Sequence, residues 1–243
     1  MLLPSLVLFA LSVVSGMLGI GVAFAAVPVL SLFLPDLVND VFPLSLALNG
    51  ITALFSLAGF AHAGLVRWRR ALLLALPTTL AAPLGALLAR DTPEALLWLI
   101  YFLAVGWLLY ETLLTRPVEG GRLRFPLALG LALPIAFVTG LIGVGPGFML
   151  VPVLARCGIP FKQSAALNAF AVVPSSFAAA ATLSGQSNLA PGLAATLLAA
   201  SAVGALIGAI LASRHLPTRA LRIILGLTIL AVSAYKAVQL LAA

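Results

Sequence analysis

The chain has 243 residues, of which 63% are hydrophobic and only 8% are charged, against roughly 25% charged residues in soluble domains. Its mean hydropathy of +1.22 excludes a soluble globular protein, because that composition would expose far too much apolar surface to water. The net charge of +7 is explained by basic loop residues that set membrane topology and contact anionic lipid, so we expect membrane lipid and no nucleic acid as a partner.

The first half of the chain, residues 1–115, begins with a long apolar segment that glycine interrupts. This segment is Pro4–Leu34, and it contains the stretch SGMLGIGVAFAAVPVL. Since about 20 mostly apolar residues cross a membrane, three ordinary transmembrane helices are expected after it, over Val41–Gly64, Ala71–Arg90 and Glu94–Thr115. The apolar start is longer than the core of a signal peptide and has no basic leader, so we expect it to be retained.

A hydrophilic stretch, residues 116–124, is expected to be a cytoplasmic linker to the second half, residues 125–243. The second half repeats the order of the first. It begins with another glycine-broken segment, Phe125–Arg156, which contains TGLIGVGPGFMLVPVL. The helices expected after this segment span Phe161–Gly185, Leu189–Ser213 and Thr218–Leu241.

The two halves align as copies of one unit. Five residues of the first broken segment match the second without a gap: Gly16, Gly19, Gly21, Phe24 and Pro28 fall on Gly140, Gly143, Gly145, Phe148 and Pro152. Further on, Asn49 falls on Asn168, and the first half carries a longer loop over residues 35–40. A weaker match pairs Ala82–Ala89 with Gly204–Leu211. Internal duplication of this kind is typical of secondary transporters.

Loop charges indicate how the halves lie in the membrane. If every expected segment crossed once, basic residues would lie on both faces, against the positive-inside rule. If each broken segment instead enters and leaves by the same face, only Arg90 and Lys236 lie opposite the other eleven basic residues. We therefore predict an all-α integral membrane protein of two inverted four-segment repeats, each opening with a re-entrant helix, with both termini outside.

The broken segments are candidate anion sites. Glycine spacing in membrane helices also serves close packing, but the duplication, the matching prolines and the loop charges favour a break. Backbone that leaves a helix inside the bilayer must face protein or a watery cavity, and the N–H end of a short helix carries about half a positive charge. The expected substrate donors lie at Gly19, Gly21, Val22, Gly143, Gly145 and Gly147.

Polar side chains near the breaks supply further candidates. Asn49 and Asn168 could each donate hydrogen bonds to an oxyanion, with contact between helices as the alternative role. Ser15 and Thr139 directly precede the first glycine of each motif and are expected to cap half-helices. The remaining candidate substrate residues carry hydroxyls that could instead bond their own helix backbone: Thr52, Ser175 and Ser176.

Few residues could carry proton, metal or covalent chemistry. His62 is a candidate proton carrier, with a place at the membrane interface as the alternative, and Glu111 is expected at the interface. Two histidines are too few for a metal cluster. Ser56 does not share the helical face of His62 and no GxSG motif is present, as an intramembrane serine protease would require. We expect no metal, no cofactor and no enzymatic activity, and we assign the single Cys157 to packing.

A GxxGxG…P element occurs in both halves, each is followed by a helix with ALN, and HAGLVRWRRAL follows the first. In these features the chain resembles the sulfite exporter TauE/SafE family of bacterial permeases. The resemblance implies a multi-pass protein of the bacterial inner membrane that exports sulfite, sulfoacetate or other organosulfonates. The sequence departs from the family pattern at Val22, Ala23, Asn49, Arg67, Pro146 and Asn168.

We expect a secondary transporter that works by alternating access, with a small anion held by the half-helix N-termini and the paired asparagines. The sequence leaves open a passive anion channel and a permease for other small carboxylate-type anions. No carboxylate or lysine is expected deep in the membrane, which favours an anion site over proton or sodium antiport. Whether the protein forms a homodimer is also left open.

Overall fold

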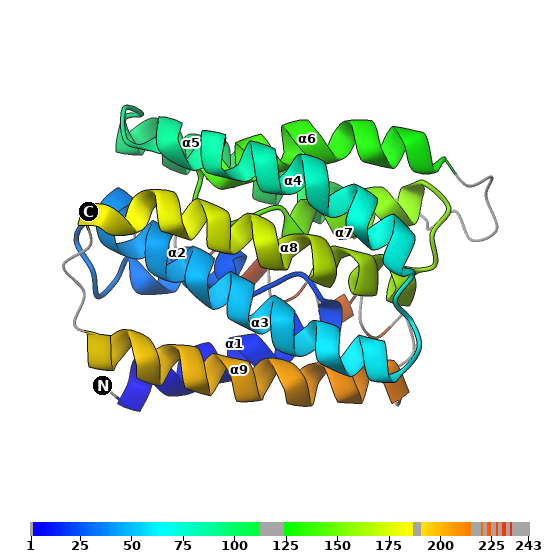
Figure 1. The fold of residues 1–243 in the computed structure, drawn as a ribbon. Coiled ribbons are helices and arrows are strands. Elements are labelled where there is room, and N and C mark those ends of the chain that lie inside the picture. Colours follow the sequence, from blue (N-terminus) through cyan, green and yellow to red (C-terminus); the bar gives the residue numbers. More distant parts are fainter. Residues whose placement is uncertain are drawn as a thin grey trace.

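The computed structural model describes residues 2–111, 124–186 and 191–214, together with positions 220, 223–224, 227, 230–231 and 234. Every regular element within these ranges is a helix, and the helices lie side by side as a bundle (Figure 1). Most of the expected linker over residues 116–124 and most of the expected helix Thr218–Leu241 lie outside the described residues.

The first half forms a broken helix pair and three longer helices. The first broken segment is divided into α1 (Leu2–Leu18) and α2 (Ala23–Leu30). A short π-helical turn, η1 (Leu37–Val41), lies in the expected longer loop. The helices that follow it are α3 (Phe42–His62), α4 (Trp68–Ala89) and α5 (Glu94–Leu109).

The second half repeats this order as far as the structure describes it. Its broken pair is α6 (Phe125–Leu141) and α7 (Gly147–Arg156), and the elements that follow are α8 (Phe161–Leu183), the 3-10 turn η3 (Ser184–Gln186) and α9 (Pro191–Arg214). Four stretches of the described residues are long and apolar enough to cross a membrane: Leu37–His62, Trp68–Ala89, Phe161–Leu183 and Ala194–Ser213.

Glycine produces both helix breaks, as the sequence predicted. α1 ends at Leu18 and α6 at Leu141, and each helix is followed by glycines in the left-handed backbone region. That region is disfavoured for residues with a Cβ atom, so glycine is what allows the chain to turn there. Four glycines have positive φ at the breaks: Gly19 (63°), Gly21 (76°), Gly143 (69°) and Gly145 (70°).

The half-helices after the breaks begin without the side-chain caps that the sequence predicted. The residues that precede α2 and α7 are Val22 and Pro146, and neither side chain makes a capping hydrogen bond. Ser15 lies inside α1, and Thr139 lies inside α6, where its hydroxyl donates to the carbonyl of Ile135 (2.7 Å). The predicted capping roles of Ser15 and Thr139 are wrong, because helical backbone continues past both residues before the break begins.

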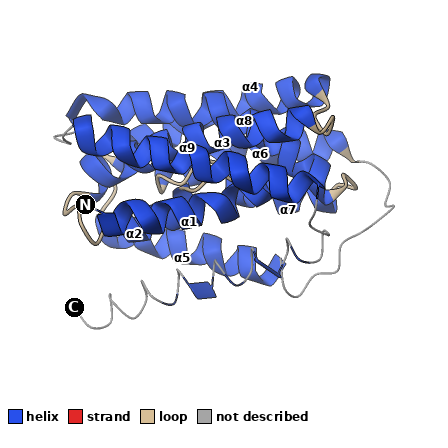
Figure 2. Cartoon of the chain, turned by 90° about the horizontal axis from the view of Figure 1, so that it is seen from below, coloured by secondary structure: helices blue, strands red, loops and turns tan. Residues whose placement is uncertain are grey.

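Helices of the two halves interleave. α3 and α8 lie side by side at the centre, α1 packs on α9, and α6 packs on α4 (Figures 1 and 2). α9 also packs on α3, and α4 packs on α8. Exchanging the two halves maps each of these helix pairs onto another pair or onto itself. The duplication in the sequence therefore extends to the packing.

Equivalent glycines make the closest contacts between these helices. A Cβ on Gly16 of α1 would clash with the carbonyl oxygen of Ala205 in α9. A Cβ on Gly140 of α6 would clash in the same way with the carbonyl oxygen of Ala82 in α4. Both helix pairs therefore approach one another at a matched glycine.

A second set of contacts corrects the register of the repeat. A Cβ on Gly208 would clash with the carbonyl oxygen of Val13, and a Cβ on Gly85 would clash with that of Phe137. These equivalent surroundings match Gly85 to Gly208. The sequence alignment of residues 82–89 with 204–211 placed Gly85 on Ile207 instead, so the predicted register is wrong by one residue.

Charged residues separate to the two ends of the bundle. At one end, the amide of Arg124 donates to the carbonyl of Cys157 (2.9 Å), which brings the start of α6 and the end of α7 together. The turn between α3 and α4 lies at this end as well (Figure 1). The basic residues of this end, which we call the basic end, are Arg67, Arg69, Arg70, Arg124, Arg156 and Lys162.

The opposite end carries most of the acidic residues. There the guanidinium of Arg90, after α4, donates to the carbonyl of Thr182 near the end of α8. η1 and η3 contact each other at the same end. The acidic residues of this end are Asp36, Asp40, Asp91 and Glu94.

Glu111 is placed differently from the other acidic residues. Its side chain is only 3% exposed and pairs with Nε of Arg156 (2.6 Å), which is 55% exposed. The ion pair connects the end of α5 with the last turn of α7. Glu111 therefore lies at the basic end, and its burial is possible because the guanidinium compensates the carboxylate charge. Its interfacial position stays a prediction.

Candidate functional site at the helix breaks

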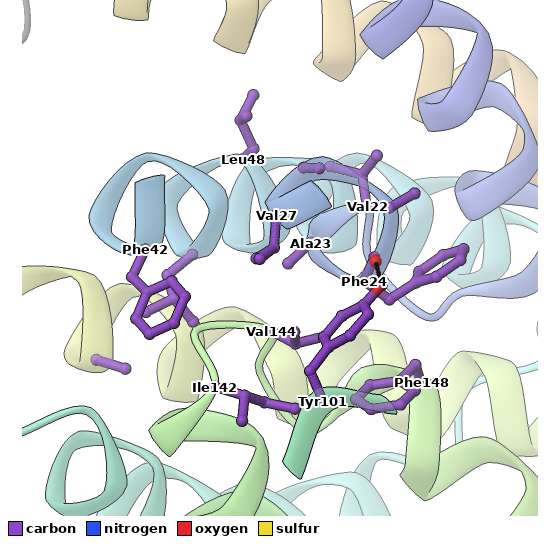
Figure 3. Packing of buried hydrophobic residues seen from close by; sticks show 14 of the residues in the cluster. Val22, Ala23, Phe24, Val27, Phe42, Leu48, Tyr101, Ile142, Val144 and Phe148 are labelled. Carbon is purple, nitrogen blue, oxygen red and sulfur yellow. Dashed lines mark hydrogen bonds between the residues drawn. The ribbon is translucent and has the colours of Figure 1, made fainter. Parts of the chain in front are cut away.

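The two helix breaks touch each other inside the bundle. Gly147, the first residue of α7, lies against the first break, and a Cβ at this position would clash with the carbonyl oxygen of Ile20. Hydrophobic residues from both breaks, among them Val22 and Val144, are buried around this contact (Figure 3). Glycine at position 147 is therefore required for the two broken backbones to meet.

Side chains of α3 occupy the N-terminal amides of α2. The amide of Val22 donates to Oγ1 of Thr52 (3.2 Å), and the amide of Ala23 donates to Oδ1 of Asn49 (3.1 Å). Asn49 and Thr52 are fully buried, and their spacing places them on one face of α3. They satisfy the start of α2 as an N-cap side chain would, but from a neighbouring helix.

Asn49 contacts both breaks at once. Its Nδ2 donates to Oγ of Ser176 on α8 (2.9 Å). A Cβ on Gly21 would clash with the Asn49 side chain. A Cβ on Gly145 would lie 2.6 Å from Asn49 Nδ2 and 2.9 Å from the Ser176 hydroxyl. The asparagine side chain thus fills the space left by two glycines, one from each break.

The N-terminus of α7 has no such cap. Pro146 has no N–H, and the amide of Leu150 donates to the carbonyl of Pro146 (3.0 Å). Within the described part of the chain, the earlier amides of α7, those of Gly147, Phe148 and Met149, have no acceptor. Such amides form the positive end of the helix dipole. Three unused donors therefore lie at α7, whereas among the described residues α2 has one, the amide of Phe24.

Asn168 contacts a carbonyl rather than an amide. Its Nδ2 donates to the carbonyl of Gly19 (2.6 Å), whereas its buried Oδ1 has no partner among the described residues. At the other break, the hydroxyl of Ser45 donates to the carbonyl of Gly143 (2.7 Å). The two asparagines that the sequence pairs therefore bind different groups, since Asn49 binds an amide and Asn168 a carbonyl.

The family model for the sulfite exporter TauE/SafE matches residues 5–236, nearly the whole chain. The chain belongs to this family. The resemblance to this family is confirmed, and with it the prediction of a transmembrane transporter, since the family is one of transporters and not of enzymes. Comparison with curated proteins and with solved structures finds no match.

The three predicted hydroxyl candidates of this TauE/SafE protein differ in their surroundings. Ser175 donates to the carbonyl of Ala171, four residues earlier in α8 (2.9 Å), and so bonds its own helix. Ser176, the next residue, accepts the hydrogen bond from Asn49 instead. Thr52 does both, because it accepts from the start of α2 and donates to its own helix. Thr52 and Ser176 therefore lie at the breaks, whereas the hydroxyl of Ser175 bonds only carbonyls of α8 among the described residues.

His62 lies far along α3 from the breaks of this TauE/SafE protein. It is the last residue of the helix, is exposed, and lies near Arg67 and Arg69 at the basic end. At 1.5 Å per residue, it is about 20 Å from Asn49. In the ranges that the structure describes, no group of three or more His, Cys, Asp or Glu is placed to hold a metal ion. The polar groups at the breaks are amides and hydroxyls.

Tyr101 on α5 is a residue that sequence reasoning missed in this TauE/SafE protein. Pro28 has no N–H, so the carbonyl of Phe24, four residues earlier in α2, loses its helical donor. The hydroxyl of Tyr101 donates to that carbonyl (2.7 Å), beside Val144 and Phe148 (Figure 3). The available signal was Pro28 itself, because a proline inside a buried helix leaves a carbonyl that another residue must satisfy.

Proposed function

We propose that this protein is a secondary transporter that exports small sulfur-containing anions, such as sulfite, sulfoacetate or other organosulfonates, across the bacterial inner membrane. The observation that carries the proposal is the uncapped start of α7 at the point where the two breaks meet. An anion there would accept from backbone amides at the positive end of a helix, in surroundings from which water is largely excluded.

We place each broken segment in the membrane as a re-entrant pair, with the two halves inverted. The ten residues of α7 extend about 15 Å, half of the hydrocarbon core. The hydrogen bond between Arg124 and Cys157 supports entry and exit of the second pair at the basic end. α1 begins at the opposite end (Figure 1), which supports inversion of the first pair. The basic end is then cytoplasmic.

The membrane potential alone can drive this export. A cell interior is electrically negative, so the free energy of a monovalent anion falls by about 2.3 kcal/mol per 100 mV when the anion leaves the cell. Export therefore requires no coupled proton, which agrees with a break region built from amides and hydroxyls. The basic residues of the cytoplasmic end raise the local concentration of anions at the entrance.

Sulfite and sulfonates present three oxygens to the protein, and the α7 side of the contact has donors for them. These donors are the amides of Gly147 and Phe148, with the hydroxyl of Ser176 nearby. At α2, an anion would first have to displace Asn49 and Thr52 from the amides they cap. We therefore assign the anion to α7, and alternating access would expose it to each face in turn.

The proposal is tested by sulfite efflux from proteoliposomes that contain the purified protein. An imposed potential, negative inside, is expected to accelerate efflux, and the rate is expected to saturate with sulfite concentration. Efflux that rises linearly without saturation would indicate a channel, and transport of acetate but not of sulfite or sulfoacetate would indicate a carboxylate permease. Protein-free liposomes are the control.

We predict that Ser176→Ala raises the sulfite concentration for half-maximal efflux by about tenfold or more, because a hydrogen bond to a charged group contributes roughly 1.5–3 kcal/mol. Ser175→Ala is the matched control, since the neighbouring hydroxyl bonds only its own helix. Thermal unfolding of both variants checks that they remain folded. Equal sulfite dependence of the two variants would remove Ser176 from the site.

A further inference from the structure

Three buried hydroxyls in the bundle lack hydrogen-bond partners. Ser12 and Ser15 in α1 and Ser201 in α9 are fully buried, and the Oγ of each has no partner among the described residues. Other buried hydroxyls, such as those of Ser56 and Thr78, donate to a carbonyl one turn earlier in their own helix. The three exceptions all belong to one pair of packed helices.

The three hydroxyls lie along the contact between α1 and α9, which we call the α1–α9 seam. A Cβ on Gly204 would lie 3.2 Å from the Cβ of Ser12, so Ser12 faces α9. Ser201 precedes Gly204 by three residues and shares its face of α9. Ser15 follows Ser12 by three residues and lies next to Gly16, which also packs on α9.

The equivalent seam, between α6 and α4, has satisfied hydroxyls. The repeat, in its corrected register, matches three pairs of residues: Ser15 with Thr139, Ser201 with Thr78, and Ser12 with Ala136. Thr139 donates to the carbonyl of Ile135 (2.7 Å), and Thr78 donates to that of Leu74 (2.9 Å). The contacts of Gly16 and Gly208 have equivalents in the second seam, at Gly140 and Gly85, whereas Gly204, which lies against Phe9 and Ser12, falls on Ala81. The shared contacts do not account for the unpartnered hydroxyls of the first seam.

We propose that the α1–α9 seam is the outward part of the anion path, in which the hydroxyls of Ser15, Ser12 and Ser201 donate hydrogen bonds to the oxygens of a small sulfur oxyanion. This inference rests on the proposed function. Ser15 lies about one turn before the break at Gly19, and α1 begins at the end of the bundle opposite the basic end (Figure 1). The hydroxyls therefore lead from the breaks toward the outer face.

The chemistry of the seam suits an anion in passage. A buried hydroxyl without a partner costs free energy in apolar surroundings, and a ligand oxygen removes that cost. Neutral hydroxyls bind an anion less tightly than lysine or arginine would, so they do not retain it. Neither α1 nor α9 contains an acidic residue that would repel an anion or attract a cation.

The first test is thiol labelling in right-side-out membrane vesicles, on the full chain with Cys157→Ser. Single variants Ser12→Cys, Ser15→Cys and Ser201→Cys are compared with Thr78→Cys and Ala136→Cys in the equivalent seam. We expect an anionic sulfonatoethyl methanethiosulfonate, added outside, to modify the first three about tenfold faster than the last two, since only the first seam has free donors for a sulfonate. Methanesulfonate is expected to slow that reaction.

Three labelling results would overturn the proposal. One is equal modification of the two seams by the anionic reagent. Another is faster modification of the α1–α9 seam by the cationic trimethylammonioethyl reagent than by the anionic one, which would indicate a cation path. Labelling that methanesulfonate leaves unchanged would indicate that the seam holds water only, and would overturn the proposal as well.

The second test separates the seam from the site at the breaks. The double variant Ser12→Ala and Ser201→Ala is expected to lower maximal sulfite efflux about tenfold, because two donors to the passing anion are lost, while calorimetric sulfite affinity stays unchanged. Ser56→Ala, which removes a buried hydroxyl elsewhere, is the control. Unchanged efflux in the double variant would overturn the seam proposal alone. Absence of sulfite binding and efflux in the wild type would overturn the proposed function.

Discussion

Asp36 satisfies the backbone of the turn that leads into α3. Its carboxylate accepts hydrogen bonds from the amides of Val38 (3.1 Å) and Asn39 (2.8 Å) and from the side chain of Asn39 (2.8 Å). The hydrogen bonds from Asn39 contribute most to holding the pKa of Asp36 below its ordinary value of 3.8, because they favour the charged form.

We predict that Asp36→Ala lowers the free energy of unfolding at pH 7 by about 1 kcal/mol, as loss of a capping side chain does. A carboxyl with a lowered pKa in the folded protein contributes stability above its unfolded pKa, near 3.8, and this contribution is lost as the pH falls through the folded value. Thermal unfolding of wild type and variant at neutral pH and below pH 3.8 measures the change. A difference that stays constant between the two conditions would contradict the prediction.

Residue identities near the breaks could be predicted from the sequence, but their partners could not. Asn49 was found from its place after a glycine motif, whereas its bond to Ser176 depends on α3 and α8 lying side by side. Ser45 was missed, although it matches Ser164 at the spacing that relates the two asparagines. Alignment alone implied equal roles for Asn49 and Asn168, and the structure gives them different ones.

At the scale of elements, α2 depends on a donor from α5. We predict that Tyr101→Phe costs about 1–3 kcal/mol of unfolding free energy, because it leaves the carbonyl of Phe24 buried without a donor. The same substitution in a Pro28→Ala background is expected to cost less, since the restored N–H can donate to Phe24 within α2. Thermal unfolding of the two single variants and the double variant measures this coupling. Strictly additive effects would contradict it.

Substitution by alanine is expected to have opposite effects on stability at two glycines of α6. Gly140→Ala is expected to destabilise the protein by about 1–3 kcal/mol or more, because the new Cβ clashes with the backbone of Ala82. Gly130→Ala, in the same helix, meets nothing within 4 Å and is expected to stabilise by roughly 0.5–1 kcal/mol, the usual gain from alanine in a helix. Thermal unfolding compares them, and destabilisation by Gly130→Ala equal to that by Gly140→Ala would refute the packing explanation.

The helices and their breaks were largely predictable, because glycine and proline act on the local backbone. The glycines at 19, 21, 143 and 145 all take the backbone conformation that ends a helix. The capping roles of Ser15 and Thr139 failed because the sequence does not show where within the motif the helix stops. The predicted alignment of α4 with α9 was wrong by one residue, because alanine-rich stretches align almost equally well when they are shifted by one position.

At the scale of the whole molecule, interleaved packing limits how the protein can move. Since α1 packs on α9 and α6 packs on α4, the two sequence halves are not separate lobes. The alternating access that we propose would therefore slide helices along the two glycine seams, because separating one half from the other would break these contacts. This arrangement could not be predicted from the sequence. The duplication shows that two units exist, but it does not show which helices of one unit pack on which helices of the other.

The distribution of charge was predictable, apart from the ion pair of Glu111. The described basic loop residues that the positive-inside argument grouped together share one end of the bundle, with Arg90 at the other. The burial of Glu111 could not be predicted, because it depends on Arg156, which is distant in sequence and brought close by the return of α7 to the basic end.

The central claim is that a sulfur oxyanion binds at the first turn of α7, where the two helix breaks meet. The most direct measurement is an anomalous difference map from crystals grown with selenite, in which selenium replaces the sulfur of sulfite. We predict a peak next to the amides of Gly147 and Phe148, beside the Ser176 hydroxyl. Peaks confined to the basic end, with none at the breaks, would contradict the claim.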